Sequence, residues 1–257
     1  MARSIMSDIK RDHIHKLLSK GKRVDGRAWD EMRPVTVEKD YVESAEGSAR
    51  VKLGNTDVLV GVKMVIGTPF EDTPDKGVLA TNAELIPLAS PTFESGPPDE
   101  DSIELARVVD RGIRESEMID LSSLCITPKE EVWMCFVDVY VLDYDGNLFD
   151  AAFLGAVSAL KSTIVPAKRN GKGEDFPLPV KASPISCTAV QIENSILFDP
   201  TLDEEKVAEA RLTVTTDENG DIRAMQKGLE GSLTLEQVRK IIETSQRLGK
   251  DLRKLVG

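Results

Sequence analysis

One run of the sequence restricts the possible folds more than any other: EEVWMCFVDVYVLDYDGNLFDAAFLGAVSAL, residues 130 to 160. Both alternating sets of positions from Val132 to Leu142 are largely apolar, which is typical of a central strand covered on both faces. A tight turn at Gly146 then leads into an Ala- and Leu-rich helix that we expect from Phe149 to about Lys161. The run predicts a sheet with a helix close to its central strand.

The turn at the end of this strand has the form of an anion-binding site. The first N–H groups of a helix have no intrahelical partner, and the helix dipole favours a negative charge there. The residues that would face the anion are Leu148, Phe149 and Asp150, which bring two apolar side chains and a carboxylate. The scaffold of an anion site is therefore present without side chains that would hold an anion.

Further strands and a helix are predicted before residue 130. Residues 48 to 67 form two alternating strands joined across Gly54, and residues 77 to 91 form another strand. An acidic loop, 94 to 101, suits the start of a helix over residues 102 to 119. One face of that helix carries Leu105, Val109, Gly112 and Ile113.

The second half repeats this order after a connection rich in Pro, Gly and Lys. Strands are expected over residues 185 to 199 and 210 to 226, the latter turning at Asn219-Gly220 in a type I′ hairpin. Thr234 should cap a last helix whose inner side carries Leu235, Val238, Ile241, Ile242 and Leu248. We predict an α+β chain of two similarly organised halves, divided as 1–30, 31–166, 167–184 and 185–257.

Composition limits the partners of the chain. The net charge of −11 argues against a protein that coats nucleic acid over its whole surface, so a polyanion would have to meet a local basic patch or a surface completed by another subunit. No apolar run approaches the length that spans a bilayer, and residues 1 to 18 lack the apolar core of a secretory signal. We expect a cytoplasmic protein without a membrane partner.

The cysteines and histidines exclude several kinds of site. Cys125, Cys135 and Cys187 are odd in number and widely spaced, so neither a disulfide framework nor a zinc site is indicated. His13 and His15 are two positions apart and point to different sides of a helix, so they do not suggest a shared metal ion. Most histidine-based acid–base mechanisms are thereby excluded.

Three arginines form a stripe on the helix over residues 102 to 119. Arg107, Arg111 and Arg114 lie within about 60° of one another at 100° per residue, opposite the apolar face. Such a ridge could hold successive phosphates of a nucleic-acid strand. It could also be a solvated face of ion pairs, because Glu104, Asp110 and Glu115 stand at pairing distance along the helix. Both interpretations remain open at this point.

A cluster of acids follows the second pair of strands. Asp199, Asp203, Glu204, Glu205 and Glu209 could form a magnesium or acid–base site, or a charged surface loop with a short helical turn. Arg211 lies where the chain re-enters a strand and where a catalytic carboxylate would have a defined position. A guanidinium cannot accept a proton or bind a metal, so we favour the surface loop.

Taken together, four features resemble the RNase PH family: RVDGR, GSARVKLGNTDVLVGV, DVYVLDYDGNLFDAAFLGAVSAL and the final order of acidic loop, hairpin and helix. The resemblance covers residues from about 23 to 253. Within the family, ELARVVDRGIRES and DGNLFDAA are most similar to the non-catalytic ring subunit of the archaeal exosome. The resemblance implies two halves like the second domain of ribosomal protein S5, assembled in a hexameric ring.

Active members of this family degrade RNA from its 3′ end with inorganic phosphate as nucleophile, and the resemblance implies that three of their positions have changed here. Their phosphate turn carries Ser or Thr followed by Arg, where this chain has Leu148 and Phe149, with Asp150 next to repel a dianion. Their Asp, a general acid or metal ligand, corresponds to Arg211. Their pair of arginines before the long helix corresponds to Glu100 and Asp101.

The resemblance also implies a function for the arginine stripe. Arg107 and Arg111, and less clearly Arg114, would hold the RNA backbone beside the active site of a partner. The chain would be inactive alone, without a cofactor or metal, and would alternate with a homologous catalytic subunit in a 3+3 ring. Inorganic phosphate would be co-substrate at the partner's site, and RNA-binding cap subunits and single-stranded RNA would be further partners.

Two alternatives stay open. The chain could be a self-sufficient phosphate-dependent 3′-to-5′ exoribonuclease that uses acids such as Asp199 or Asp203. It could also be a purely architectural ring subunit whose arginines only pair with neighbouring acids.

Overall fold

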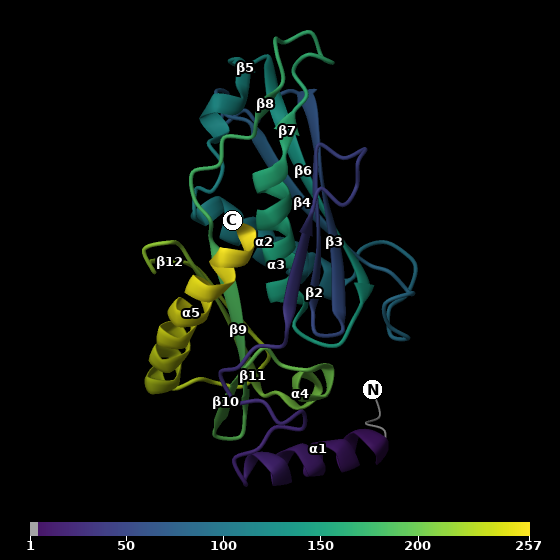
Figure 1. Ribbon diagram of the computed structural model, residues 1–257, viewed down its shortest axis with the longest axis vertical. Coiled ribbons are helices and arrows are strands. Elements are labelled where there is room, and N and C mark those ends of the chain that lie inside the picture. Colours follow the sequence, from purple (N-terminus) through teal and green to yellow (C-terminus); the bar gives the residue numbers. More distant parts are fainter. Residues whose placement is uncertain (1–4) are drawn as a thin grey trace.

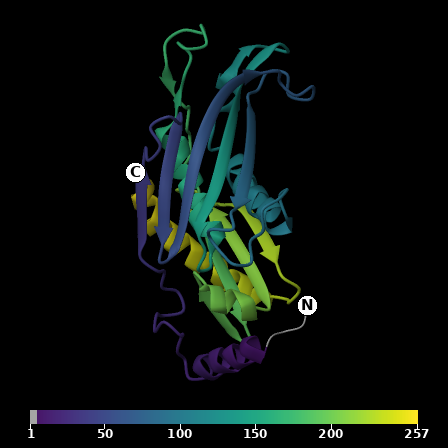
Figure 2. The same ribbon diagram turned by 90° about the vertical axis from the view of Figure 1, so that its right-hand side faces the viewer.

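The structure is a computed structural model that describes residues 5–257, so residues 1–4 of the expected N-terminal segment lie outside the described part. Its larger sheet has the strand order β1-β2-β3-β6-β4, with β5 paired to β6 beyond this path. Only β4 runs parallel to its neighbour, β6. The strands are β1 (Val35–Lys39), β2 (Gly47–Leu53), β3 (Thr56–Gly67), β4 (Val78–Leu85), β5 (Cys125–Thr127) and β6 (Glu131–Asp143). Figure 2 shows these strands side by side.

The smaller sheet is built from the second half of the chain and is antiparallel throughout, in the order β10-β9-β11-β12. Its strands are β9 (Ile185–Ile192), β10 (Ser195–Phe198), β11 (Ala210–Thr216) and β12 (Ile222–Gly228). The short helix α4 (Leu202–Val207) follows β10, and the long helix α5 (Leu235–Val256) packs on β9 and β11. The prediction of an α+β chain in two halves, each of strands packed with helices, is confirmed.

Helix α3 (Leu148–Ser162) lies between the two sheets (Figure 1). It contacts β2 and β3 on one side and β9 on the other, and every residue from Leu148 to Leu160 is buried. Small side chains allow this close packing, since a Cβ at Gly155 would lie 2.8 Å from a methyl group of Val60. The Ala- and Leu-rich composition therefore belongs to a helix that is covered on all sides.

The expectation that β6 is covered on both faces is wrong. Its side chains toward α3 are buried: Trp133, Cys135, Val137, Val139 and Val141. The opposite set is only partly covered apart from Val132, and Tyr140 is 36% exposed, because the helices that contact the sheet lie on the buried face. Burial raises the pKa of the Cys135 thiol to about 12, which agrees with a core position.

Helix α2 (Glu100–Glu115) packs beside α3 and against β4. Asp99 caps it by accepting a hydrogen bond from the Ser102 N–H at 2.8 Å, so the acidic loop does start the helix. Its predicted apolar face is confirmed as buried. Gly112 permits the contact with α3, because a Cβ there would lie 2.2 Å from the ring of Phe153.

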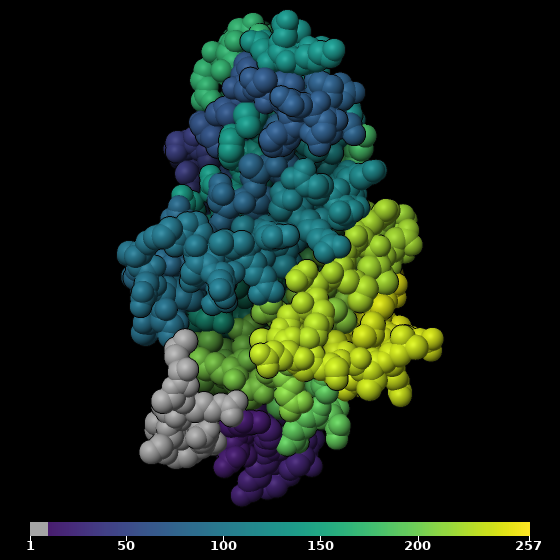
Figure 3. Space-filling view, turned by 180° about the vertical axis from the view of Figure 1, so that it is seen from behind, coloured from purple at the N-terminus to yellow at the C-terminus, as the bar shows by residue number. Residues whose placement is uncertain are grey.

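The N-terminal helix α1 (Ile5–Leu18) does not pack on the larger sheet. Ile14 and Leu18 are buried against Val190, Ile192 and Leu197 of the smaller sheet, and Figure 1 shows α1 below β10. The connection between the halves contains two short paired strands, β7 (Ile164–Val165) and β8 (Phe176–Pro177), and a 3-10 helix (Leu121–Leu124) precedes β5. Figure 3 shows the first half, in blue and teal, directly against the second half, in green and yellow.

Two local predictions for the second half are wrong. The β11–β12 connection spans Asp217 to Asp221 with a register shift, and Asn219 does not have the positive φ that a type I′ turn requires. Leu235, expected on the inner side of α5, is 68% exposed because it begins the helix beyond the sheet edge. Thr234 does cap α5, in a capping box with Gln237. Among the helices of residues 5–257, none combines the length and apolarity needed to cross a membrane.

Candidate functional site

The turn between β6 and α3 is held tightly against the segment that precedes α4. Gly146 has a φ of +90°, and a Cβ there would lie 2.5 Å from the backbone of Pro200 and Leu202. The Gly146 carbonyl accepts a hydrogen bond from the Thr56 hydroxyl at 2.6 Å, and Arg33 donates to the carbonyl of Asp145 at 2.7 Å. Glycine is needed at position 146 because of the positive φ and because a Cβ would clash. The second half of the chain forms one wall of the turn.

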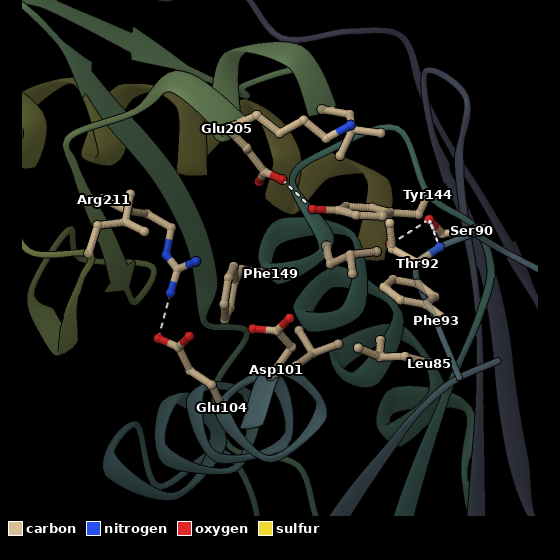
Figure 4. Close-up of a pocket in the computed structure, with 15 residues that line it drawn as sticks. Leu85, Ser90, Thr92, Phe93, Asp101, Glu104, Tyr144, Phe149, Glu205 and Arg211 are labelled. Carbon is tan, nitrogen blue, oxygen red and sulfur yellow. Dashed lines mark hydrogen bonds and ion pairs between the residues drawn. The ribbon is translucent and has the colours of Figure 1, made fainter. Parts of the chain in front are cut away.

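A carboxylate of the chain itself binds the N-cap residue of this turn. Glu205 Oε1 accepts a hydrogen bond from the Asn147 N–H at 2.8 Å, and Oε2 accepts one from the Tyr144 hydroxyl at 2.7 Å. Burial raises the pKa of Glu205, although these two hydrogen bonds act in the opposite direction. Figure 4 shows the Glu205 carboxylate meeting the Tyr144 hydroxyl.

A cavity of about 290 Å³ opens beside this carboxylate. Its apolar wall includes the predicted turn residues Leu148 and Phe149. Asp101 also lines it, and burial together with Asp99 and Glu104 raises the pKa of Asp101. At the turn itself a dianion would meet the hydrocarbon of Leu148 and Phe149, and the carboxylates of Asp101, Glu104 and Glu205 line the same cavity.

Arg211 projects from β11 into the same cavity and is engaged within the chain. Its guanidinium carbon lies 4.1 Å from the centre of the Phe149 ring, and Nη2 lies 2.5 Å from Glu104 Oε1. Figure 4 shows Phe149 beside the guanidinium and Glu104 at its end. Arg211, expected to mark a degenerate catalytic position, thus forms an ion pair with Glu104 and a cation–π contact with Phe149. Both contacts join the two halves.

Asp150 does not face this cavity, which differs from the expectation that it repels an anion at the turn. Its carboxylate accepts hydrogen bonds from the Thr188 N–H at 3.0 Å, the Thr188 hydroxyl at 2.7 Å and the Asn147 amide at 2.8 Å. Burial raises the pKa of Asp150 to about 7, although the hydrogen bonds from Asn147 and Thr188 lower it. At 100° per residue, its side chain leaves α3 about 200° away from that of Leu148, toward β9.

The arginine stripe lines a groove on the outer side of α2, with Gln226 of β12 opposite. Arg107, Arg111 and Arg114 are all exposed. Arg114 pairs with Asp110 at 3.0 Å and donates to the Leu79 carbonyl at 3.1 Å. Within residues 5–257, Arg107 and Arg111 have no ion-pair partner, so only one of the three suggested pairs forms.

The acidic cluster is not the surface loop that we favoured. Asp199 and Glu204 are buried, and they pair with arginines of the segment before β1. Arg33 reaches Asp199 at 2.7 Å, and Arg23 reaches Glu204 at 2.6 Å. Burial raises the pKa of Asp199, but Arg33 and a hydrogen bond from Asn147 hold it below its usual range. Glu209 is exposed as expected, and Asp203 is partly exposed beside Lys10.

The described residues offer no group of three or more histidine, cysteine or carboxylate side chains that could hold a metal ion.

The structure also assigns a contact to Glu205 that the spacing of the acids did not reveal. Its only signal in the sequence was membership of the cluster after Asp199, because its partner Asn147 lies 58 residues earlier.

Comparison with known proteins agrees with this fold. The chain matches the two models of the 3′ exoribonuclease family, domain 1 over residues 31–166 and domain 2 over residues 182–247. The chain therefore belongs to the RNase PH family.

Individual relatives are similar over nearly the whole chain. An exosome complex component Rrp42 of Methanocella arvoryzae is 55% identical, over 100% of this chain and 99% of that protein. A chain of the Archaeoglobus fulgidus exosome, solved with RNA bound to the active site, superposes with a TM-score of 0.95 and 51% identity, over 98% of this chain and 99% of that one. A chain of an archaeal exosome core has a TM-score of 0.92 and 47% identity, over 100% and 99%.

Proposed function

We propose that this chain is a non-catalytic ring subunit of an archaeal exosome, which supports a homologous catalytic subunit and supplies arginines that hold RNA. The similarity to Rrp42 and to chains of two archaeal exosome structures supports the assembly. The ring would contain three copies of each chain and would bind RNA-binding cap subunits. It would degrade single-stranded RNA from the 3′ end by phosphorolysis.

The observation that carries the non-catalytic part is the turn at Asn147. Its N–H already donates to Glu205, and Leu148 and Phe149 replace the hydroxyl and guanidinium that would bind phosphate. The attacking phosphate would therefore bind at the partner's turn, and this chain would need no cofactor of its own. The arginines would hold the RNA backbone and carry no base sequence information.

The burial of Asp199 disfavours a self-sufficient enzyme. Asp199 is buried and its carboxylate is held by Arg27, Arg33 and Asn147. Asp203 lies on the opposite side of α4 from Glu205, beside Lys10. Neither carboxylate lines the cavity at the turn.

The test is to incubate RNA and inorganic phosphate with the purified chain, with the purified catalytic partner, and with the two chains together. We expect nucleoside diphosphates only when the partner is present, and faster release from the combined chains because the RNA is held. Nucleoside diphosphate release by this chain alone would contradict the proposal.

A further inference from the structure

Glu104 stands between the cavity at the turn and the groove of the arginine stripe, and it lines both. It lies three residues before Arg107 on α2, a spacing at which an acid and an arginine share one helix face and pair. Glu104 could therefore neutralise Arg107. In the structure it pairs instead with Arg211 of the second half.

The guanidinium of Arg211 is held in a slot that directs it to Glu104. The Phe149 ring lies on one side at 4.1 Å. Gly228 faces Arg211 across the β11–β12 ladder, and a Cβ there would lie 2.5 Å from Nη2 and 2.9 Å from Cζ. Only 14% of the Arg211 side chain is exposed, so the ion pair is shielded from water more than a pair on an open helix face.

The same helix shows what happens where no such arginine intervenes. Asp110 pairs with Arg114 at i, i+4, with their side chains 26% and 46% exposed. Arg107 and Arg111 keep unneutralised charges among the described residues.

We propose that Arg211 is a positioning residue: by holding Glu104, it keeps Arg107 free to contact a phosphate of the RNA backbone. This inference rests on the proposed function and adds to it an arginine that acts from the opposite half without touching RNA. The residue that replaces a catalytic acid would thus serve the RNA-holding surface. Removal of Arg211 should release Glu104 to pair with Arg107.

The test measures the affinity of the full chain, assembled with its catalytic partner, for single-stranded RNA over a series of salt concentrations. Arg211→Met keeps an apolar contact with Phe149 but removes the charge. We expect affinity about twofold lower, the effect of one helix ion pair, and a salt slope smaller by up to about 0.7, the value of one contact with a single strand. Glu104→Gln added to Arg211→Met should restore both, and Glu104→Gln alone should change little.

The matched control is Arg247→Met. It removes the same charge from α5, where Arg247 forms an exposed pair with Asp30. Unchanged binding in Arg211→Met, or a loss that Glu104→Gln does not reverse, would overturn the inference. If Arg211→Met reduces assembly, the test uses Gly228→Ala instead. The added methyl group displaces the Arg211 guanidinium while the charges of Arg211 and Glu104 both remain. Gly228→Ala should weaken binding in the same Glu104-dependent manner, and independence from Glu104 would overturn the inference.

Arg107→Glu separates this inference from the proposed function. Weaker RNA binding in Arg107→Glu with no effect of Arg211→Met removes only the positioning role. Unchanged binding in Arg107→Glu removes the RNA contact itself, and with it the proposed function of the stripe.

Discussion

Glu205 accepts a hydrogen bond from the Asn147 N–H. A phosphate at this turn would likewise accept from backbone N–H groups at the start of α3. Each presents an oxygen to an N–H at the start of α3, where the helix dipole favours a negative charge. The carboxylate is part of the chain, so it occupies the position without the entropy cost of capturing a free ion. Tyr144 holds its second oxygen and fixes its orientation. The Asn147 N–H therefore has a partner within the chain.

Asp150 should make stability depend on pH. Its pKa is about 7 in the folded chain and would be about 4 when unfolded, so the folded state holds more protons between these values. The free energy of unfolding should therefore fall as pH rises from about 4 to about 7, with a limiting slope of about 1.4 kcal/mol per unit. Asp150→Asn should lose this contribution, which denaturant unfolding at several pH values measures.

The comparison of the two chains isolates Asp150. Glu205 also has a raised pKa and contributes a slope of the same sign, but it is present in both. Asp199 has a lowered pKa, and its contribution is lost only as pH falls below the usual aspartate range. Parallel stability curves for the original chain and Asp150→Asn would refute the role assigned to this carboxyl.

Two exposed arginines of helix α2 should contribute to RNA binding. Arg107→Glu combined with Arg111→Glu should weaken binding of single-stranded RNA to the assembled ring and lower the salt slope by about 1.4, since each contact contributes about 0.7. Arg114→Glu is the matched control on the same helix, and its effect should be smaller because Arg114 is already engaged by Asp110 and Leu79. Affinity and salt slope that match the unmodified ring would favour a purely architectural subunit.

The sequence predicted elements well where one local pattern decides them. The apolar face of α2, the Thr234 cap of α5 and the hairpin at Gly54 follow from spacing and turn chemistry. The prediction that the outer face of β6 is covered was wrong, because apolar residues do not reveal which face of a strand a helix covers. Asn219-Gly220 was misjudged because Asp217 organises a longer turn by accepting from the N–H groups of Asn219 and Asp221.

Contacts between distant parts of the whole chain could not be predicted from local spacing. Arg23 and Glu204 lie 181 residues apart, and Arg33 and Asp199 lie 166 apart. The two pairs bury charges that stabilise the junction only as complete pairs. The same limit applied to Arg211, whose partner Glu104 lies 107 residues earlier. The sequence indicated that Leu148, Phe149 and Arg211 are unusual at this site, but not the contacts that they make.

The most direct measurement follows the backbone N–H signals of the ¹⁵N-labelled chain by NMR while inorganic phosphate is added, first to the isolated chain and then with its unlabelled partner. We predict no saturable shift at Asn147, Leu148 or Phe149 in either case, because Glu205 already accepts from the Asn147 N–H and the turn presents the apolar side chains of Leu148 and Phe149. Saturable shifts of these three signals in the isolated chain would show a phosphate site here and contradict the account.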